Sequence, residues 1–263
     1  MGSATTQALA TATTALDAAS GVDLDVAREL FAAARTLGGS SQLSGALADS
    51  SVVSSARSTL VAAVFGPSMS ATTVALLTKI VEQRWSSASD LVDGIEELAI
   101  RAAAIAEPDA DVEDELFRFS RTIAENSELE LALGSRLGEA SAKGDLVETL
   151  LGGRASASTT LIVSSLVQQP RERRVRQLLT WATKLVADQR GRIVATVFAA
   201  VPLSAAQGDR LAATLSQRYG STVSINTVVD PSVVGGLRVQ VADDVIDASV
   251  SSRLADLRSR LAG

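Results

Sequence analysis

The sequence contains no cysteine and no histidine, and aromatic residues make up only 3% of its 263 residues. The lack of cysteine excludes disulfides and thiolate nucleophiles, and it fits a cytosolic protein better than a small secreted one. Zinc sites built from Cys and His are excluded too, together with the side chain that most often acts as a general base near neutral pH. An enzyme is therefore the least favoured of the functional classes considered.

The chain also has few positive charges for its length. A net charge of -6 and a pI near 4.9 argue against a nucleic-acid partner, because such binding depends on a basic surface. One cationic cluster stands out, and its arginines are Arg171, Arg173, Arg174 and Arg176. We interpret this cluster as a solvated helix face, with a rim contact to an acidic partner as the alternative.

Long hydrophobic runs are missing as well. The longest, at residues 193–203, is much shorter than the roughly 18 apolar residues that a membrane helix needs. Residues 1–17 show no basic region followed by an apolar core, so no signal peptide is visible. We expect a soluble protein without direct membrane insertion, which would need another chain to hold it at a membrane.

What the sequence does contain is an internal repeat. A single offset of 86 residues places Val26 on Val112 and residues 29–31 (Glu-Leu-Phe) on residues 115–117. The same offset aligns Gly66 with Gly152 and residues 70–71 (Ser-Ala) with residues 156–157. So long a gap-free match indicates duplication.

Each copy has the pattern of a helical bundle. Residues 27–37 carry apolar side chains at the three-and-four spacing of one helical face, and the equivalent stretch of the second copy does the same. Ser70 and Ser156 precede apolar runs, where a hydroxyl can accept the free amide protons of a first helical turn. We predict bundles of five or six short helices at residues 5–88 and 90–187.

An acidic run, residues 109–115, lies early in the second copy. Five carboxylates in seven residues raise the possibility of a metal site. We favour a helix start instead, because negative side chains stabilise the positive end of a helix dipole.

After residue 191 the pattern changes from helical to extended. Residues 193–200 read as a buried strand, and Ser204 and Gln207 have the spacing of a capping box for a helix that ends at Gly220. Further strands are predicted at residues 222–229 and 237–241, and a last helix at residues 250–261. The predicted order is βαββα, with Gly235 and Gly236 entering the third strand through a bulge or a close backbone approach.

Two chemical sites were considered in this region. No phosphate loop is present, and the Gly235–Gly236 pair leads into a strand rather than a helix, so we expect no nucleotide and no other cofactor. The carboxylates Asp243, Asp244 and Asp247 could form a general acid–base pair, but a hairpin turn and a cap explain them better.

The predicted fold is therefore α+β and mostly α, with two duplicated helical bundles followed by a small βαββα domain. Its expected domains are residues 1–89, 90–188 and 189–263.

The C-terminal region resembles the δ subunit of bacterial F-type ATP synthase, the family of the mitochondrial oligomycin-sensitivity-conferring protein. The similar residues include spaced hydrophobics, an acidic residue, a Gly-Gly pair and a Val-Ile-Asp run, namely Asp230, Gly235, Gly236, Val245, Ile246 and Asp247. The second copy resembles the helical domain of this family, including residues 115–117 and 150–152. Two departures are Ala242 and Ala248, which stand where the family usually has glycine.

The resemblance implies a non-catalytic stator subunit at the cytoplasmic face of the cell membrane. In the family, the helical domain binds an N-terminal helix of an α subunit, and the C-terminal domain meets the b subunits of the peripheral stalk. The extra first copy resembles the extended actinobacterial type, in which δ is free-standing or fused to a stalk segment, and we expect a free-standing chain. The alternative is a helical adaptor of another complex.

We further expect the α-subunit helix to lie in a groove of the second copy, between its first and fifth helices. The residues expected to line it are Ile95, Leu98, Ala102, Leu161, Ser165 and Leu166. The first copy would then brace the stalk or a second α subunit.

Overall fold

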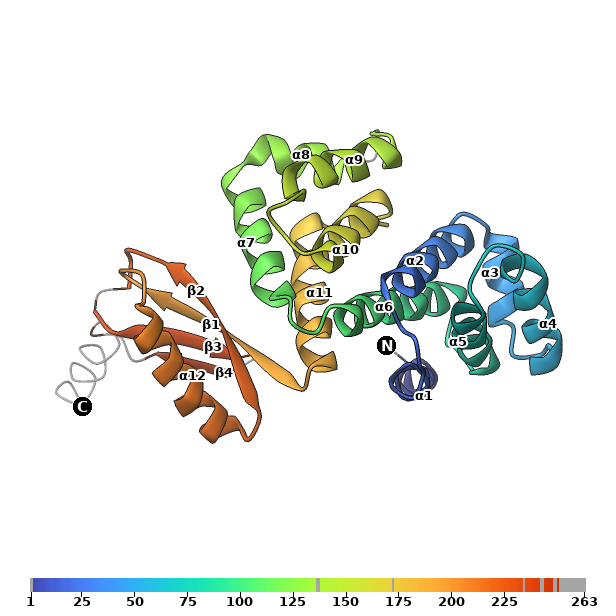
Figure 1. Cartoon of the computed structure of the whole chain (residues 1–263), viewed down its shortest axis with the longest axis horizontal. Helices are drawn as coiled ribbons and strands as arrows, with labels where there is room; N and C mark the ends of the chain where they lie inside the picture. Colours follow the sequence, from blue (N-terminus) through green and yellow to red (C-terminus); the bar gives the residue numbers. More distant parts are fainter. Residues whose placement is uncertain are drawn as a thin grey trace, which may run out of the picture. The chain divides into compact units, whose positions relative to one another are not determined.

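The computed structural model describes residues 2–135, 138–171, 173–233, 235–241, 244–247 and 250. The chain divides into two compact units, residues 1–185 and 186–263. The first unit is helical and the second contains a sheet (Figure 1). The mostly helical α+β class predicted from the sequence is confirmed.

The first unit begins with five helices of the first copy. They are α1 (Ser3–Asp17), α2 (Leu24–Gly38), α3 (Ser41–Ala48), α4 (Ser54–Phe65) and α5 (Ala71–Glu82). A long helix follows, and then four helices of the second copy. They are α6 (Ala88–Ala106), α7 (Val112–Glu125), α8 (Ser127–Gly134), α9 (Ala140–Leu151) and α10 (Ala157–Gln168). The last helix of the copy, α11 (Val175–Gln189), contains the boundary between the two units.

The offset of 86 residues seen in the sequence also relates the helices. It places the bounds of α3, α4 and α5 on those of α8, α9 and α10, and it places α1 and α2 within two to three residues of α6 and α7. It also places α6 on α11. Helix α6 is therefore the sixth helix of the first copy and the first helix of the second, so the boundary predicted at residues 89–90 falls at the start of a shared helix.

Sharing α6 explains its unusual burial. Thirteen of its 19 residues are buried, whereas only four of 15 are buried in α1. It packs against α1, α2, α3 and α5 of the first copy and against α10 of the second, and Figure 1 shows it lying between the two sets of helices. A helix enclosed on nearly all sides must be mostly apolar or have its charges paired. The three buried charged residues of α6, Glu96, Glu97 and Arg101, all form ion pairs.

Helix caps confirm the sequence signals. The hydroxyls of Ser70 and Ser156 accept hydrogen bonds from the amides of Thr73 and Thr159, three residues on. The capping box of Ser204 with Gln207 is present in both directions, and Gly220 ends that helix in the left-handed conformation.

The second unit holds a four-stranded sheet with one helix. Its elements are β1 (Arg192–Ala199), α12 (Ala205–Tyr219), β2 (Thr222–Val229), β3 (Leu237–Val241) and β4 (Asp244–Asp247). The strand order is β2-β1-β3-β4, with β1 parallel to β2 and antiparallel to β3. Leu215 of α12 packs with Ala195, Val197, Val223 and Val239 to form the core.

Two details correct the predicted βαββα order. A fourth strand, β4, was missed, since residues 244–247 were assigned to a turn and a cap. Strands β2 and β3 run in opposite directions, but they are not neighbours, because β1 lies between them. The predicted last helix, residues 250–261, lies outside the described residues except for Val250, and so do Ala242, Asp243 and Ala248.

Gly94 of α6 makes room for the side chain of Trp85, which lies in the loop between α5 and α6. A Cβ added at Gly94 would lie 2.2 Å from Cη2 of Trp85, whose indole is buried and donates a hydrogen bond to the carbonyl of Ile80. Overpacking of this kind costs typically about 1–3 kcal/mol. We expect Gly94→Ala to lower the free energy of unfolding by about 1–3 kcal/mol in urea titrations followed by circular dichroism.

Gly45→Ala provides the matched control, because Gly45 also lies inside a helix and a Cβ there would meet no atom within 4 Å. Since alanine is the better helix former, this change should stabilise by roughly 0.5–1 kcal/mol. Equal effects of the two substitutions would contradict the role given to the Trp85 contact.

Candidate interaction surfaces

The residues predicted to line a groove in the second copy are mostly core residues. Ile95, Leu98, Ala102 and Leu166 have 0% exposure and Ser165 has 5%, while Leu161 is partly exposed. Helix α2 packs against both α6 and α10 on this side of the molecule. Its last residue, Gly38, approaches the Gln169 amide so closely that a Cβ would lie 2.3 Å from Nε2. A partner helix could reach the buried residues only by displacing this packing.

Three of the six equivalent positions in the first copy are more open, whereas Ala12, Leu16 and Ile80, the equivalents of Leu98, Ala102 and Leu166, are also 0% exposed. Subtracting the offset from Ile95, Leu161 and Ser165 gives Leu9, Ala75 and Lys79. Leu9 is half-buried, and the other two are exposed. Helices α1 and α5 pack together here, so their outer surfaces form one continuous face, which we call the α1–α5 face.

A carboxylate holds the start of the fifth helix in each copy. Oε2 of Glu115 accepts hydrogen bonds from the hydroxyls of Ser156 and Thr159, both at 2.6 Å, and from the Ser156 amide at 3.0 Å. Glu29 makes the same bonds in the first copy, with Ser70 Oγ at 2.7 Å and Thr73 Oγ1 at 2.5 Å. The two members of the acidic run nearest to it, Glu113 and Asp114, lie with Glu115 in the first turn of α7, as a helix start predicts.

These contacts shift the acidity of both carboxyls. Burial raises the pKa of each, but the hydrogen bonds from Ser and Thr outweigh it, so the pKa of Glu29 and that of Glu115 both lie below the usual 4.5. The hydrogen bonds favour the charged form because an ionised carboxylate accepts them more strongly.

The arginine cluster before α11 is not uniformly solvated, which corrects its interpretation as a solvated face. Arg171 Nη2 lies 2.8 Å from Oε2 of the buried Glu96 and 2.6 Å from Oδ1 of Asp93. Arg173 also pairs with Glu96, and its guanidinium lies 5.0 Å from the ring centre of Trp181. Arg174 and Arg176 are exposed, and Arg176 pairs with Glu130 at 3.0 Å.

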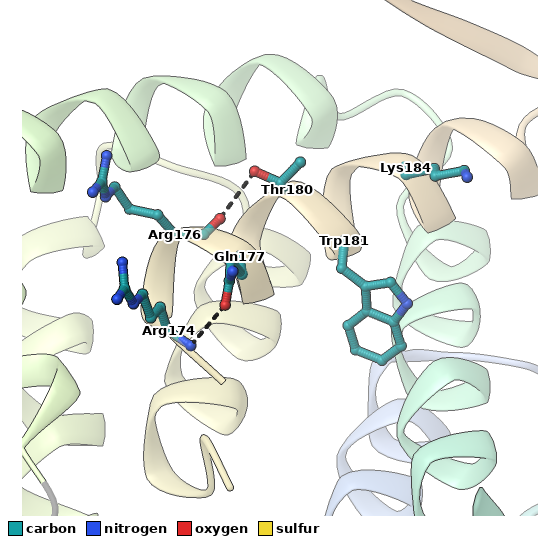
Figure 2. Close-up of a pocket in the computed structure, with 6 residues that line it drawn as sticks. All are labelled: Arg174, Arg176, Gln177, Thr180, Trp181 and Lys184. Carbon is teal, nitrogen blue, oxygen red and sulfur yellow. Dashed lines mark hydrogen bonds between the residues drawn. The ribbon is translucent and has the colours of Figure 1, made fainter. Parts of the chain in front are cut away.

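The exposed side of α11 forms an open depression of about 510 Å³. Figure 2 shows its lining residues, which come from α11 and the residue before it: Arg174, Arg176, Gln177, Thr180, Trp181 and Lys184. Oε1 of Gln177 accepts a hydrogen bond from the Arg174 amide, and the Thr180 hydroxyl donates one to the Arg176 carbonyl. These two side chains are therefore held by the backbone of neighbouring residues.

In the second unit, the six residues on which the family resemblance rests lie in the β2–β3 connection and in β4. The Asp230 carboxylate accepts hydrogen bonds from Ser232 Oγ and from the Ser232 amide, at 2.6 and 2.9 Å, which lower its pKa. Gly235 and Gly236 have φ of 64° and 78°, in the region that favours glycine. The bulge or close backbone approach predicted there stays a prediction.

The remaining three of these six residues follow one another along β4. Ile246 pairs with Val239 and packs on the core, whereas Val245 is 55% exposed and Asp247 is exposed opposite Arg238. These residues form the edge strand of the described sheet.

The described part of the chain offers neither a metal site nor a membrane-spanning helix. No group of three or more His, Cys, Asp or Glu side chains there could hold a metal ion. Every helix there is too short or too polar to cross a membrane.

Comparison with known proteins gives a consistent result. The profile of the family described as "ATP synthase delta (OSCP) subunit" matches residues 98–261. A protein of Leifsonia xyli named "ATP synthase subunit delta" is 48% identical, with 100% of both chains covered. Proteins of the same name from Streptomyces avermitilis and Streptomyces griseus are 42% and 41% identical, covering 98% and 100% of both chains.

The lowered pKa values predict a specific response to acid. A carboxyl whose pKa is lower in the folded state stabilises the protein above its unfolded pKa, and this contribution is lost as the pH falls through the folded value. We expect the free energy of unfolding to decrease as the pH drops below about 4.5, the usual value for glutamate, and to decrease less steeply in Glu29→Gln/Glu115→Gln.

Urea titrations between pH 3 and pH 6 would measure this difference. Glu128→Gln is a suitable control, because Glu128 is exposed and lies in the first turn of α8 without a tertiary partner among the described contacts. Identical pH dependence in the double variant and the wild type would contradict the role of the paired carboxylates.

Proposed function

Because the chain belongs to the ATP synthase delta (OSCP) subunit family, we propose that it is a non-catalytic stator subunit of F-type ATP synthase. It joins the b subunits of the peripheral stalk to the α subunits of the catalytic head at the cytoplasmic face of the membrane. A rotary enzyme needs such a connection, because the head must not turn with the rotor while protons drive ATP synthesis.

The observation that carries this proposal is the full-length similarity to delta subunits together with the division into two units. A linking protein needs two separate surfaces, one for each partner. The helical unit offers the α1–α5 face, and the second unit offers a small sheet whose outer strands in the described residues are β2 and β4. We assign the head to the helical unit and the stalk to the second unit.

Within the helical unit, we place the α-subunit helix on the α1–α5 face of the first copy. The equivalent face of the second copy, between α6 and α10, has α2 packed against it. The α1–α5 face includes Leu9 and Ala75, the equivalents of Ile95 and Leu161, and a small residue such as Ala75 lets a helix approach closely. This placement exchanges the roles that the sequence alone suggested for the two copies.

The helix-in-groove contact predicts the effect of one exposed substitution. Ala75→Glu should weaken binding of a synthetic α-subunit N-terminal peptide to the full chain by about tenfold or more, because a larger, charged side chain would lose its water under the peptide. Titration calorimetry would measure the affinity. Ala63→Glu is the matched control, since Ala63 is exposed on α4, away from this face.

A third variant separates the two copies. Leu161→Glu changes the partly exposed residue of α10 and should leave peptide binding unchanged. Weaker binding in Leu161→Glu, with normal binding in Ala75→Glu, would return the α-subunit helix to the second copy.

The linking role itself predicts a separation of two activities. ATP synthase reassembled without this chain should lose proton-driven ATP synthesis, while its catalytic head continues to hydrolyse ATP. Adding back the full chain should restore synthesis. Full coupling in its absence, measured in sealed vesicles by ATP formation against a proton gradient, would overturn the proposal.

A further inference from the structure

The exposed side of α11 is the repeat equivalent of a buried interface. Adding the offset of 86 residues to Leu91, Ile95 and Leu98 of α6 gives Gln177, Trp181 and Lys184 of α11. The three α6 residues have 0% exposure. Of the three α11 residues, Gln177 and Lys184 are exposed and Trp181 is partly exposed.

The reason for this difference is the position of each helix in the array. Helix α6 serves as the last helix of one copy and the first helix of the next, and in the second role it packs against α10. Helix α11 ends the second copy, and no third copy follows in the sequence. Its outward residues, Arg174, Gln177, Trp181 and Lys184, are called the α11 terminal face below.

A face that only ends an array is normally polar, because nothing packs on it. The α11 terminal face departs from this in having an indole at its centre. The other tryptophan of the chain, Trp85, is 4% exposed. Tryptophan and arginine together are the residues most enriched where binding energy is concentrated in protein interfaces.

The charges around Trp181 define the chemistry of a partner. Among the described residues, the side chains of Arg174 and Lys184 have no ion-pair partner. Arg176 lines the same depression, and Arg173 stacks on the indole. A cationic surface of this kind is unusual in a chain with a net charge of -6, and it complements an acidic partner.

We propose that the α11 terminal face binds an acidic amphipathic helix of another ATP synthase subunit. The second copy covers one side of α6, and the partner helix covers the equivalent side of α11. An apolar residue of the partner packs against Trp181, and its carboxylates lie near Arg174 and Lys184. The proposal goes beyond the stator link and does not depend on the α1–α5 face, so each can fail without the other.

The absence of cysteine from the sequence makes a site-specific test direct. Gln177→Cys carrying a short photo-activated cross-linker is assembled into the complete synthase, and the adduct is identified by mass spectrometry. We expect an adduct with an acidic helical segment of another subunit. Thr59→Cys, on the exposed side of α4, carries the same reagent and should not give this adduct.

Charge reversal tests the recognition chemistry in the same preparation. Arg174→Glu/Lys184→Glu should reduce the Gln177→Cys adduct by about tenfold, because two favourable charge contacts become repulsive. Arg84→Glu/Arg154→Glu is the control, since both residues are exposed elsewhere in the helical unit, and it should leave the yield nearly unchanged. Trp181→Ala, with helicity checked by circular dichroism, should reduce the yield as well.

Several results would overturn the proposal. They are the absence of an adduct with another subunit, an adduct with residues 186–263 of the same chain, an adduct with a second copy of the chain, and an adduct with a segment that is not acidic. An adduct whose yield is unaffected by the charge reversal would also contradict it. Full coupling of synthase that lacks the chain, together with a normal adduct when the chain is present, would count against the stator proposal alone.

Discussion

Helix α6 has to satisfy two packing environments at once, and the rest of the helical unit follows from that constraint. As the sixth helix of the first copy it meets α1, α2, α3 and α5, and as the first helix of the second copy it meets α10. A free-standing bundle could leave one side of this helix polar. Here a polar side chain on either face would be buried without water, at a cost of roughly 1–3 kcal/mol if unpaired. The two copies are therefore parts of one packed array.

Sharing a helix also decides which surfaces are left for partners. In a duplicated protein with two separate bundles, each copy would keep its own face between the first and fifth helices. In this chain that face stays open only in the first copy, at α1 and α5. Helix α11, the last helix of the array, is open as well. Duplication has thus left exposed residues on α1 and α11, the first and last helices of the array, at positions whose repeat equivalents on α6 are buried.

The sequence predicted the duplicated helices well because their signals are local and occur twice. Ser70 and Ser156 were identified as helix starts from the spacing of the residues that follow them. Because they are 86 residues apart, the same signal occurs at equivalent positions in both copies. The shared role of α6 was missed because a boundary between copies was assumed to be a boundary between bundles. A signal was available in the apolar residues at 91, 92, 95, 98 and 100, which occupy more than one face of the helix.

The sheet shows where local reasoning fails. Strand β4 has four residues with aspartate at both ends, and aspartate is unfavourable in strands, so its sequence looks like a turn. It forms because β3 offers it a free edge. Likewise, β2 and β3 are adjacent in sequence, but the α12 crossover brings β2 parallel to β1 and leaves β3 to pair on the other side of β1. Pairing choices of this kind depend on the whole sheet, which no short segment specifies.

The arginines before α11 were misread for a related reason, since their partners are about 75 residues away in sequence. Glu96 on α6 is 3% exposed, and Arg171 and Arg173 neutralise it from the α10–α11 connection. In the first copy, hydrogen bonds rather than these ion pairs join the first helix to the start of the sixth. They link the Thr5 hydroxyl to the side chains of Ser86 and Asp90.

The ion pairs of Arg171 and Arg173 with Glu96 connect the core of the second copy to its outer surface. Arg173 forms an ion pair with the buried Glu96 and lies over the ring of the partly exposed Trp181. Removing Glu96 would leave Arg173 without its ion-pair partner, whereas Arg171 would keep its pair with Asp93. A partner that packs on Trp181 would shield Arg173 from water and strengthen its ion pair with Glu96, because the pair would lie in a lower dielectric. Binding at the end of the array and the closure of the second copy are therefore expected to stabilise each other.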